Sequence, residues 1–344
     1  MKRLFKWLGA ALVGLVLVCA LPILAVETMC RGAPLPQTTA QYITQNTRPE
    51  ARTYMVYPEW HIVYAYEGYA EALKTGHPHN FPYLQAITGF WTSACALTEK
   101  ADELGEAGFN SKATIYTIGA SFTLEMLFKA AYEETIGRLF TLTTPSPQDN
   151  VEADMAQDYA TFLQQTPWYK YDFPAWSEKL WQAEPVGTRG WERRLALSLE
   201  WGAKTQYAKL IAQAAAGLGA DELTMQVALK GPVPDLPEIT ILSQQGDITI
   251  AEVPRYRIFT TLARAIAKNG ATFVEIAGND DILVSMILDQ GDFYPAQGHR
   301  LLSRTARVGF PQDRLLIATK VANLHKVFLD YPNTPVTVEH IYDY

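Results

Sequence analysis

An uncharged segment close to the start of the chain constrains the fold most strongly. Lys2, Arg3 and Lys6 precede a run without charged residues from Trp7 to Val26. About 20 apolar residues are enough for a helix to cross roughly 30 Å of hydrocarbon. Because a short basic flank stays on the cytoplasmic side, we predict a transmembrane signal-anchor helix over residues 1–26. It places the chain in a bacterial-type inner membrane, with the N-terminus in the cytoplasm and the later domains in the periplasm.

Two alternatives to a single retained anchor stay open. Cleavage after Ala25 would make the segment a signal peptide, although Ile23 fits the small-x-small pattern poorly. Residues 80–98 carry no charge and are long enough to make a second membrane contact, and residues 113–128 are interrupted only by Glu125. A carboxylate inside a membrane is costly. We therefore favour core helices for both segments.

Composition restricts the partners and the disulfide chemistry. The formal net charge is −7, and no run of Lys or Arg follows the anchor, so we expect no nucleic-acid partner. Cys19 lies in the anchor, which leaves Cys30 and Cys95 as the one pair that could form a disulfide. Spacing does not decide whether they meet. We expect both to be unpaired, with Cys95 buried.

The pattern after the anchor divides into a tether and two domains. Residues 27–52 mix Gln, Thr, Pro and Asn without an apolar period, which indicates a tether. Residues 53–230 follow helical periodicity and predict an all-α helical bundle. A Pro-rich linker at 231–234 separates them from an α+β domain over residues 235–344.

Two long helices of the bundle carry apolar stripes that we expect to face the core. The first helix covers about 112–140, and its stripe is Leu124, Leu127, Phe128, Ala131, Ile136 and Leu139. The second covers about 190–216, and its stripe is Trp191, Leu195, Leu199, Ala203, Tyr207, Leu210 and Ala214.

The C-terminal pattern predicts a duplicated fold. A strand, a helix and a strand follow one another over 248–253, 254–269 and 271–277, and Phe259, Leu262 and Ile266 share the inward face of that helix. The same succession recurs over 315–320, 323–331 and 336–342. Two β-α-β units of this kind are typical of a ferredoxin-like α+β sandwich. We interpret residues 278–312 as an inserted hairpin.

Motifs that would fix a reaction are missing from the sequence. It has no Walker loop, dinucleotide-binding glycine pattern, HExxH, paired CxxC or G-x-S-x-G elbow. A di-iron bundle needs Glu-x-x-His pairs, whereas Glu59 and His61 are two residues apart and point to different helix faces. We therefore expect no cofactor and no metal site.

Four residues are candidates for a binding site. Glu59, Trp60 and His61 lie in an aromatic segment that would desolvate an acid or a base and shift its pKa. Glu125 lies within an apolar stretch of the next long helix, so it needs a polar partner such as a buried arginine. The alternative interpretation places Glu59 against a helix N-terminus and leaves His61 with a structural hydrogen bond.

Three hypotheses for the function follow, in this order. The first is a non-catalytic, membrane-anchored envelope protein that contacts lipid through the N-terminal helix and binds a protein partner, for instance along an edge strand. The second is a protein that binds a lipid, quinone or pigment among the aromatic helices. The third is a hydrolase that uses Glu59 and His61.

Overall fold

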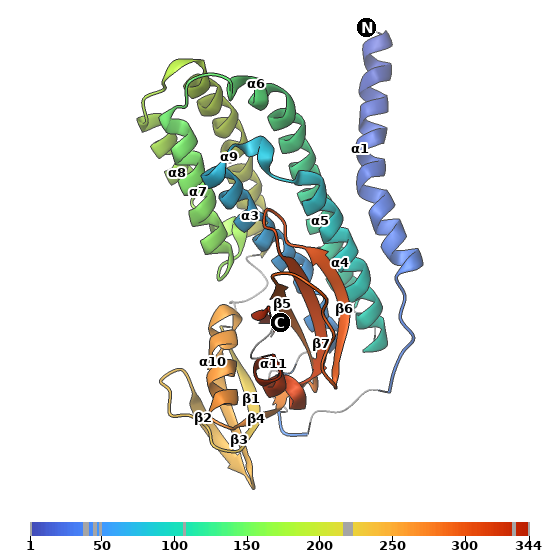
Figure 1. Cartoon of the computed structure of the whole chain (residues 1–344). Helices are drawn as coiled ribbons and strands as arrows, with labels where there is room; N and C mark the ends of the chain where they lie inside the picture. The colour runs from blue at the N-terminus through green and yellow to red at the C-terminus, as the bar shows by residue number, and fades with distance from the viewer. Residues whose placement is uncertain are drawn as a thin grey trace.

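The computed structural model describes residues 2–36, 41–43, 47, 50–105, 108–215, 223–331 and 335–342. A helical part occupies the upper half of the molecule and two β-sheets the lower half (Figure 1). The helices of the first part are α1 (Lys2–Met29), α2 (Glu50–Tyr54), α3 (Tyr57–Thr75), η1 (Pro78–Asn80), α4 (Tyr83–Glu103), α5 (Phe109–Tyr132), the π-turn η2 (Glu133–Gly137), α6 (Arg138–Phe140), α7 (Pro147–Leu163), η3 (Trp168–Lys170), α8 (Phe173–Gln182) and α9 (Gly187–Ala215).

The predicted membrane anchor is wrong. Over the described residues, no helix combines the length and the apolar character that a membrane crossing requires. This result also removes the predicted inner-membrane location with periplasmic domains. Helix α1 contains Pro22 and packs against α4 and α5 of the same chain. Val26, which the sequence assigned to the apolar span, is only 3% exposed because it belongs to this packing.

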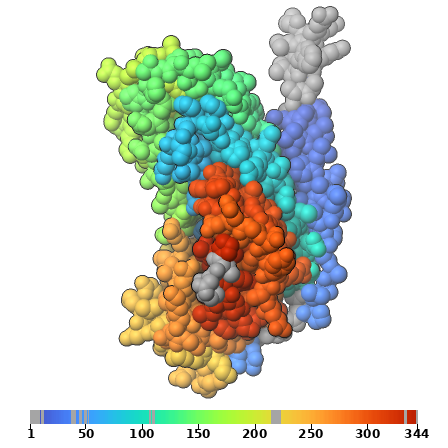
Figure 2. All heavy atoms as spheres, in the orientation of Figure 1, coloured from blue at the N-terminus to red at the C-terminus, as the bar shows by residue number. Residues whose placement is uncertain are grey.

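A disulfide fixes the end of α1 to the helical part. Cys30 and Cys95 are bonded, with Cα atoms 5.2 Å apart, so the expectation that they are unpaired was wrong. Next to this bond, Glu27 accepts a 2.5 Å hydrogen bond from Tyr116 on α5. Figure 2 shows the N-terminal helix lying along one flank of the molecule.

The helical part is built around α3. This helix begins with Pro58 in its first turn, where the missing N–H of proline costs no hydrogen bond. It packs against α4 and α7, while α9 packs against α7 and α8. Aromatic rings from several helices form the central core, including Phe90, Tyr159 and Phe173.

Two antiparallel four-stranded sheets follow, in the orders β2-β3-β1-β4 and β6-β7-β5-β8. The elements are β1 (Thr224–Lys230), β2 (Thr240–Gln245), β3 (Ile248–Pro254), α10 (Tyr256–Lys268), β4 (Thr272–Ile276), β5 (Asp281–Leu288), β6 (His299–Ala306), β7 (Asp313–Lys320), η4 (Val321–Asn323), α11 (Leu324–Leu329) and β8 (Val336–Tyr342).

The ferredoxin-like prediction is therefore wrong. The predicted strand-helix-strand segments exist as β3-α10-β4 and β7-α11-β8, but they belong to two sheets instead of one. Each pair of strands lies on either side of a further strand, β1 or β5, that the sequence interpretation assigned to other roles. The region predicted as an inserted hairpin supplies β5 and β6 of the second sheet. Each unit is thus β-β-β-α-β.

The two units share irregularities as well as strand order. The register between β2 and β3 shifts between Ile241 and Ser243, and that between β6 and β7 shifts between Leu301 and Ser303. The central strands carry a second pair of shifts, at Ala228/Leu229 and at Ser285/Met286. Since a bulge is a specific feature of a strand pair, its recurrence at matching positions supports an internal duplication.

The second sheet packs against the helical part. One face of it packs against the helices through a shared aromatic cluster that includes Tyr64 and Tyr342. Trp60 of α3 lies over His340 of β8, with ring centroids 4.0 Å apart. The first sheet is contacted by the segment that follows α1. The backbone N–H groups of residues 41–43 donate to the buried carboxylate of Glu275 on β4.

Candidate docking groove and the charged core beneath it

An open groove of about 840 Å³ runs between α9 and the chain segment from α5 to α6. Its walls are mostly apolar. One wall comes from Tyr132, Ile136 and Phe140, and the other from α9. The α9 wall consists of Gly187, Thr188, Trp191, Glu192, Leu195, Ala196 and Leu199.

The α9 wall is the stripe that the sequence predicted to be buried. Trp191, Leu195 and Leu199 are 53%, 61% and 78% exposed, so this prediction was wrong. The facing stripe shows the same inversion, since Phe128 and Leu139 are also exposed. Of this facing stripe, Ile136 is 47% exposed and lines the groove opposite α9. Contiguous exposed apolar surface of this kind marks interaction sites.

The opposite face of α9 is buried and carries charge. On this face Arg189 is 2% exposed and Arg193 is fully buried, and Trp201 belongs to the aromatic core. Buried charges are stable only when they are paired and hydrogen-bonded. The interior of this bundle must therefore be organised by ion pairs as well as by aromatic packing.

Arg193 is the centre of the first group of ion pairs. Its guanidinium donates to Glu133 at 2.9 Å, to Glu152 at 3.2 Å and to Glu192 at 2.6 Å. Burial raises the pKa of Glu133 to about 7, against the opposing effect of Arg193 and with a further increase from Glu152. The π-turn that starts at Glu133 brings Gly137 against this carboxylate, where a Cβ atom would overlap it.

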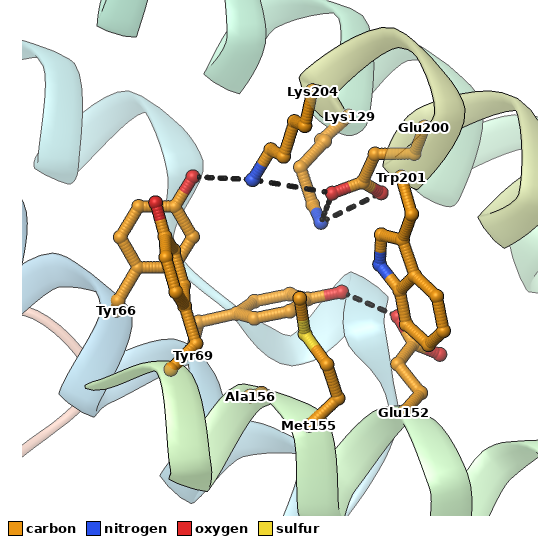
Figure 3. Close-up of a pocket in the computed structure, with 10 residues that line it drawn as sticks. Tyr66, Tyr69, Lys129, Glu152, Met155, Ala156, Glu200, Trp201 and Lys204 are labelled. Carbon is orange, nitrogen blue, oxygen red and sulfur yellow. Dashed lines mark hydrogen bonds and ion pairs between the residues drawn. The ribbon is translucent and has the colours of Figure 1, made fainter. Parts of the chain in front are cut away.

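Two lysines organise the second group, and Figure 3 shows both of them with Tyr66 and Glu200. Lys204 lies 2.7 Å from Glu125, and it donates to the hydroxyl of Tyr66 at 2.9 Å. Lys129 donates to Glu200 at 2.9 Å. Burial alone would raise the pKa of Glu200, but the two lysines outweigh it and lower that pKa to about 2. Glu200 therefore stays ionised at neutral pH.

The cavity between these two groups is small. Its volume is about 10 Å³, and its lining includes Tyr69, Glu152, Lys129 and Glu200. That is about the space one water molecule needs. This cavity cannot hold a lipid, quinone or pigment. The Tyr69 hydroxyl donates to Glu152 at its edge.

The four residues predicted as a site lie in separate environments. Glu59 is exposed in the first turn of α3, whereas His61 is 2% exposed in the aromatic core. The Nε2–H of His61 donates to the carbonyl of Ala86 at 2.9 Å, and burial lowers the pKa of His61 to about 4. His61 is therefore neutral at pH 7. Trp60 lies at the sheet interface described above.

Glu125 is the predicted residue that joins the charged core. Its partners are Lys204 and the Tyr66 hydroxyl, which donates to it, and not the arginines that the sequence suggested. The structure does not bring Glu125 together with Glu59 or His61 in the lining of either the groove or the central cavity. One sequence signal could have identified this charged core. Charged residues such as Arg193, Glu200 and Lys204 recur on one side of α9, and that side faces inward.

No protein-family model, curated protein or solved structure matches this chain. Among the residues that the structure describes, no group of three or more His, Cys, Asp or Glu side chains is placed to hold a metal ion. The groove and its surroundings are accordingly the features from which a function can be argued.

Proposed function

We propose that this chain is a non-catalytic protein that binds a partner protein in the groove between α9 and α5–α6. The observation that supports the proposal is the outward apolar face of α9, with Trp191, Leu195 and Leu199 exposed along one wall. Burying a large apolar side chain contributes about 1.5–3 kcal/mol. Three such residues can therefore make a substantial apolar contribution to association.

The shape of the groove favours a helical occupant. Its two walls are helical, and the large α9 residues recur four apart at Trp191, Leu195 and Leu199. An amphipathic helix uses the same spacing to place its apolar face in a groove. Two polar groups at this site, Glu192 and the Tyr132 hydroxyl that donates to it at 2.5 Å, already satisfy each other, and Thr188 adds one uncharged hydroxyl. The partner is therefore expected to present apolar side chains here and no charge.

A small apolar ligand is the second candidate function, favoured by the volume of the groove. About 840 Å³ lies within the range of about 300–1,000 Å³ that is usual for ligand sites. The hydrolase hypothesis receives no comparable support, because Glu59 is exposed while His61 is buried and bonded to a backbone carbonyl.

Crosslinking followed by an affinity measurement tests the proposal. A photoreactive amino acid at Leu199 should crosslink one protein in the native cells, whereas the same group at Tyr294, which is 80% exposed outside the groove, should not. That protein is then purified and titrated against the wild-type chain and against Leu195→Lys. We expect Leu195→Lys to weaken binding at least tenfold and Tyr294→Lys to leave it unchanged.

Two outcomes would contradict partner binding at this site. Equal crosslinking from Leu199 and Tyr294 would show that the groove is not selected. An affinity unchanged by Leu195→Lys would show that the crosslinked protein binds elsewhere. If Leu199 crosslinks no protein, and an apolar compound that co-purifies with the wild-type chain is lost from Leu195→Lys, the ligand-binding candidate replaces the proposal.

A further inference from the structure

Strand β2 is the outer strand of the first sheet, and it is exposed along its whole length. All six of its residues are exposed, including Ile241 at 61% and Leu242 at 47%. Successive residues of a strand point to opposite faces, so neither face of β2 is covered. Within the described part of the chain β2 pairs with β3 alone. In Figure 1 it is the outermost strand at the lower left.

The matching strand of the second unit is covered. Helix α4 packs on β6, and Arg300 of β6 forms a 2.8 Å ion pair with Glu103 of α4. Leu302, which lies in the bulge that corresponds to the one at Leu242, packs in the cluster between the helices and the second sheet. The duplicated units therefore differ at this strand. The second unit covers its outer strand with a helix of the same chain, and the first unit leaves its outer strand open.

The residues of β2 include neither the charges nor the proline that protect many edge strands, and its bulge against β3 is the protective feature that it carries. Natural edges carry lysine or other charges, or proline, which oppose pairing with another chain. The strand reads Thr-Ile-Leu-Ser-Gln-Gln and has neither. Just beyond its end, Asp247 is neutralised by Lys230 at 2.8 Å. Another strand can thus approach β2 without meeting an unpaired charge within it.

We propose that β2 pairs with β2 of a second copy of this chain, antiparallel and about a two-fold axis, so that two first sheets join into one eight-stranded sheet. An open strand edge presents a row of N–H and C=O groups with which another extended main chain can pair. An antiparallel pair of identical strands is self-complementary, as a two-fold interface requires. Because β2 is uncharged, its two copies meet without like-charge repulsion within the strand.

The size of the contact sets the conditions of the test. Six residues span about 20 Å, so the interface lies at the low end of specific contacts, and the association is weak. Light scattering after size-exclusion chromatography should therefore be run from micromolar to several hundred micromolar protein. The wild-type mass should rise toward twice 38.4 kDa over this range. Hydrogen exchange of residues 240–245 should slow as the concentration increases.

Ile241→Lys places a positive charge on each copy at the shared edge. Since Ile241 is mostly exposed, the variant should keep the wild-type melting temperature, and its self-association should weaken at least tenfold. Leu199→Lys, in the groove of the proposed function, is the matched control and should associate like the wild type.

The proposal is overturned if the wild type stays a monomer at every concentration. It is also overturned if Leu199→Lys abolishes self-association while Ile241→Lys does not, because the copies would then meet at the groove. Concentration-independent exchange at residues 240–245 in a dimeric sample would equally exclude β2 as the contact. None of these results depends on whether a helical partner occupies the groove.

Discussion

Replacing Glu133 by glutamine should stabilise the protein at pH 8 and change its stability little at pH 5. Glu133 is 5% exposed, and one of its oxygens accepts from Arg193 at 2.9 Å. Burial raises its pKa from 4.5 to about 7; Arg193 opposes the increase and the nearby Glu152 adds to it. The ionised carboxylate is therefore less stable in the folded protein than in the unfolded chain.

Because the pKa of Glu133 is higher in the folded state, the stability of the protein depends on pH. Between about pH 4.5 and pH 7 the folded state keeps a proton on Glu133 that the unfolded state has lost. The free energy of unfolding consequently falls as the pH rises through this window. A pKa change of this size corresponds to about 3 kcal/mol, which is an upper limit because part of the cost relaxes on substitution. Glutamine is neutral at both pH values and can still accept from Arg193.

Urea denaturation of the wild type and of Glu133→Gln at pH 5 and pH 8 measures the effect. We expect the variant to be more stable by about 1–3 kcal/mol at pH 8 and to differ by less than about 0.5 kcal/mol at pH 5. Glu134→Gln is the matched control, because the neighbouring carboxylate is 45% exposed and pairs only with Arg138 one turn later among the ion pairs described. A variant that is clearly less stable than the wild type at pH 8 would refute the reasoning, since the ionised pair with Arg193 would then outweigh the cost of burial.

Three further perturbations test other parts of the structure. The double change Cys30→Ser and Cys95→Ser opens a loop with a sequence separation of 65 and should lower the unfolding free energy by about 4 kcal/mol, measured by urea denaturation without reductant. Glu200→Gln should destabilise the protein by about 2–3 kcal/mol at pH 7, and the loss should shrink toward pH 3, because the stabilisation of an acid with a lowered pKa disappears as the pH falls through the window between 4.5 and about 2. Gly68→Ala should lower the unfolding free energy by about 1–3 kcal/mol in the same assay, because its Cβ would overlap the backbone carbonyl of Val308; an unchanged value would show that the two segments separate freely.

Local sequence signals identified several elements correctly. The helix predicted from Pro254 onward is α10, and Phe259, Leu262 and Ile266 are buried on the face that the periodicity indicated. Strands rich in β-branched residues were found at β3, β4, β7 and β8. Such signals act within one element, so a single sequence contains them. Pro147 shows another local signal: it starts α7 directly after the capping residue Ser146.

The pairing of the strands could not be predicted from local sequence signals. Strand β1 lies between β3 and β4, so one sheet joins residues 224–230 to residues 248–254 and 272–276. The apolar pattern of β1 does not specify these partners. A strand-helix-strand succession is compatible with more than one sheet topology. The ferredoxin-like interpretation chose the topology with a single sheet, and the additional central strands decided against it.

The prediction that the apolar faces of α5 and α9 are buried was wrong for a different reason. Periodicity shows that a helix has an apolar face, but it does not say whether this face meets the protein's own core or another surface. In α9 the core side carries Arg189 and Arg193 and remains stable because each charge has a partner, Asp149 for Arg189 and Glu133 for Arg193. No pattern in one sequence pairs Arg193 with Glu133, which lies 60 residues away. The candidate groove therefore became visible only once the partners of the buried charges were known.

Glu192 connects the charged core to the groove. It lines the groove, accepts from Tyr132 at the surface side and accepts from Arg193 in the core. A partner helix that covers the groove would remove Glu192 further from water, and this strengthens its interaction with Arg193 because electrostatic energies rise as the local dielectric constant falls. The same Arg193 holds Glu133, so docking and the protonation of Glu133 share one cation. Substitutions at Leu195 or Leu199 change the apolar contact alone, whereas substitutions at Glu133 change the electrostatic support beneath it. Comparing the two sets in one binding assay separates the contribution of the groove surface from that of the core on which it rests.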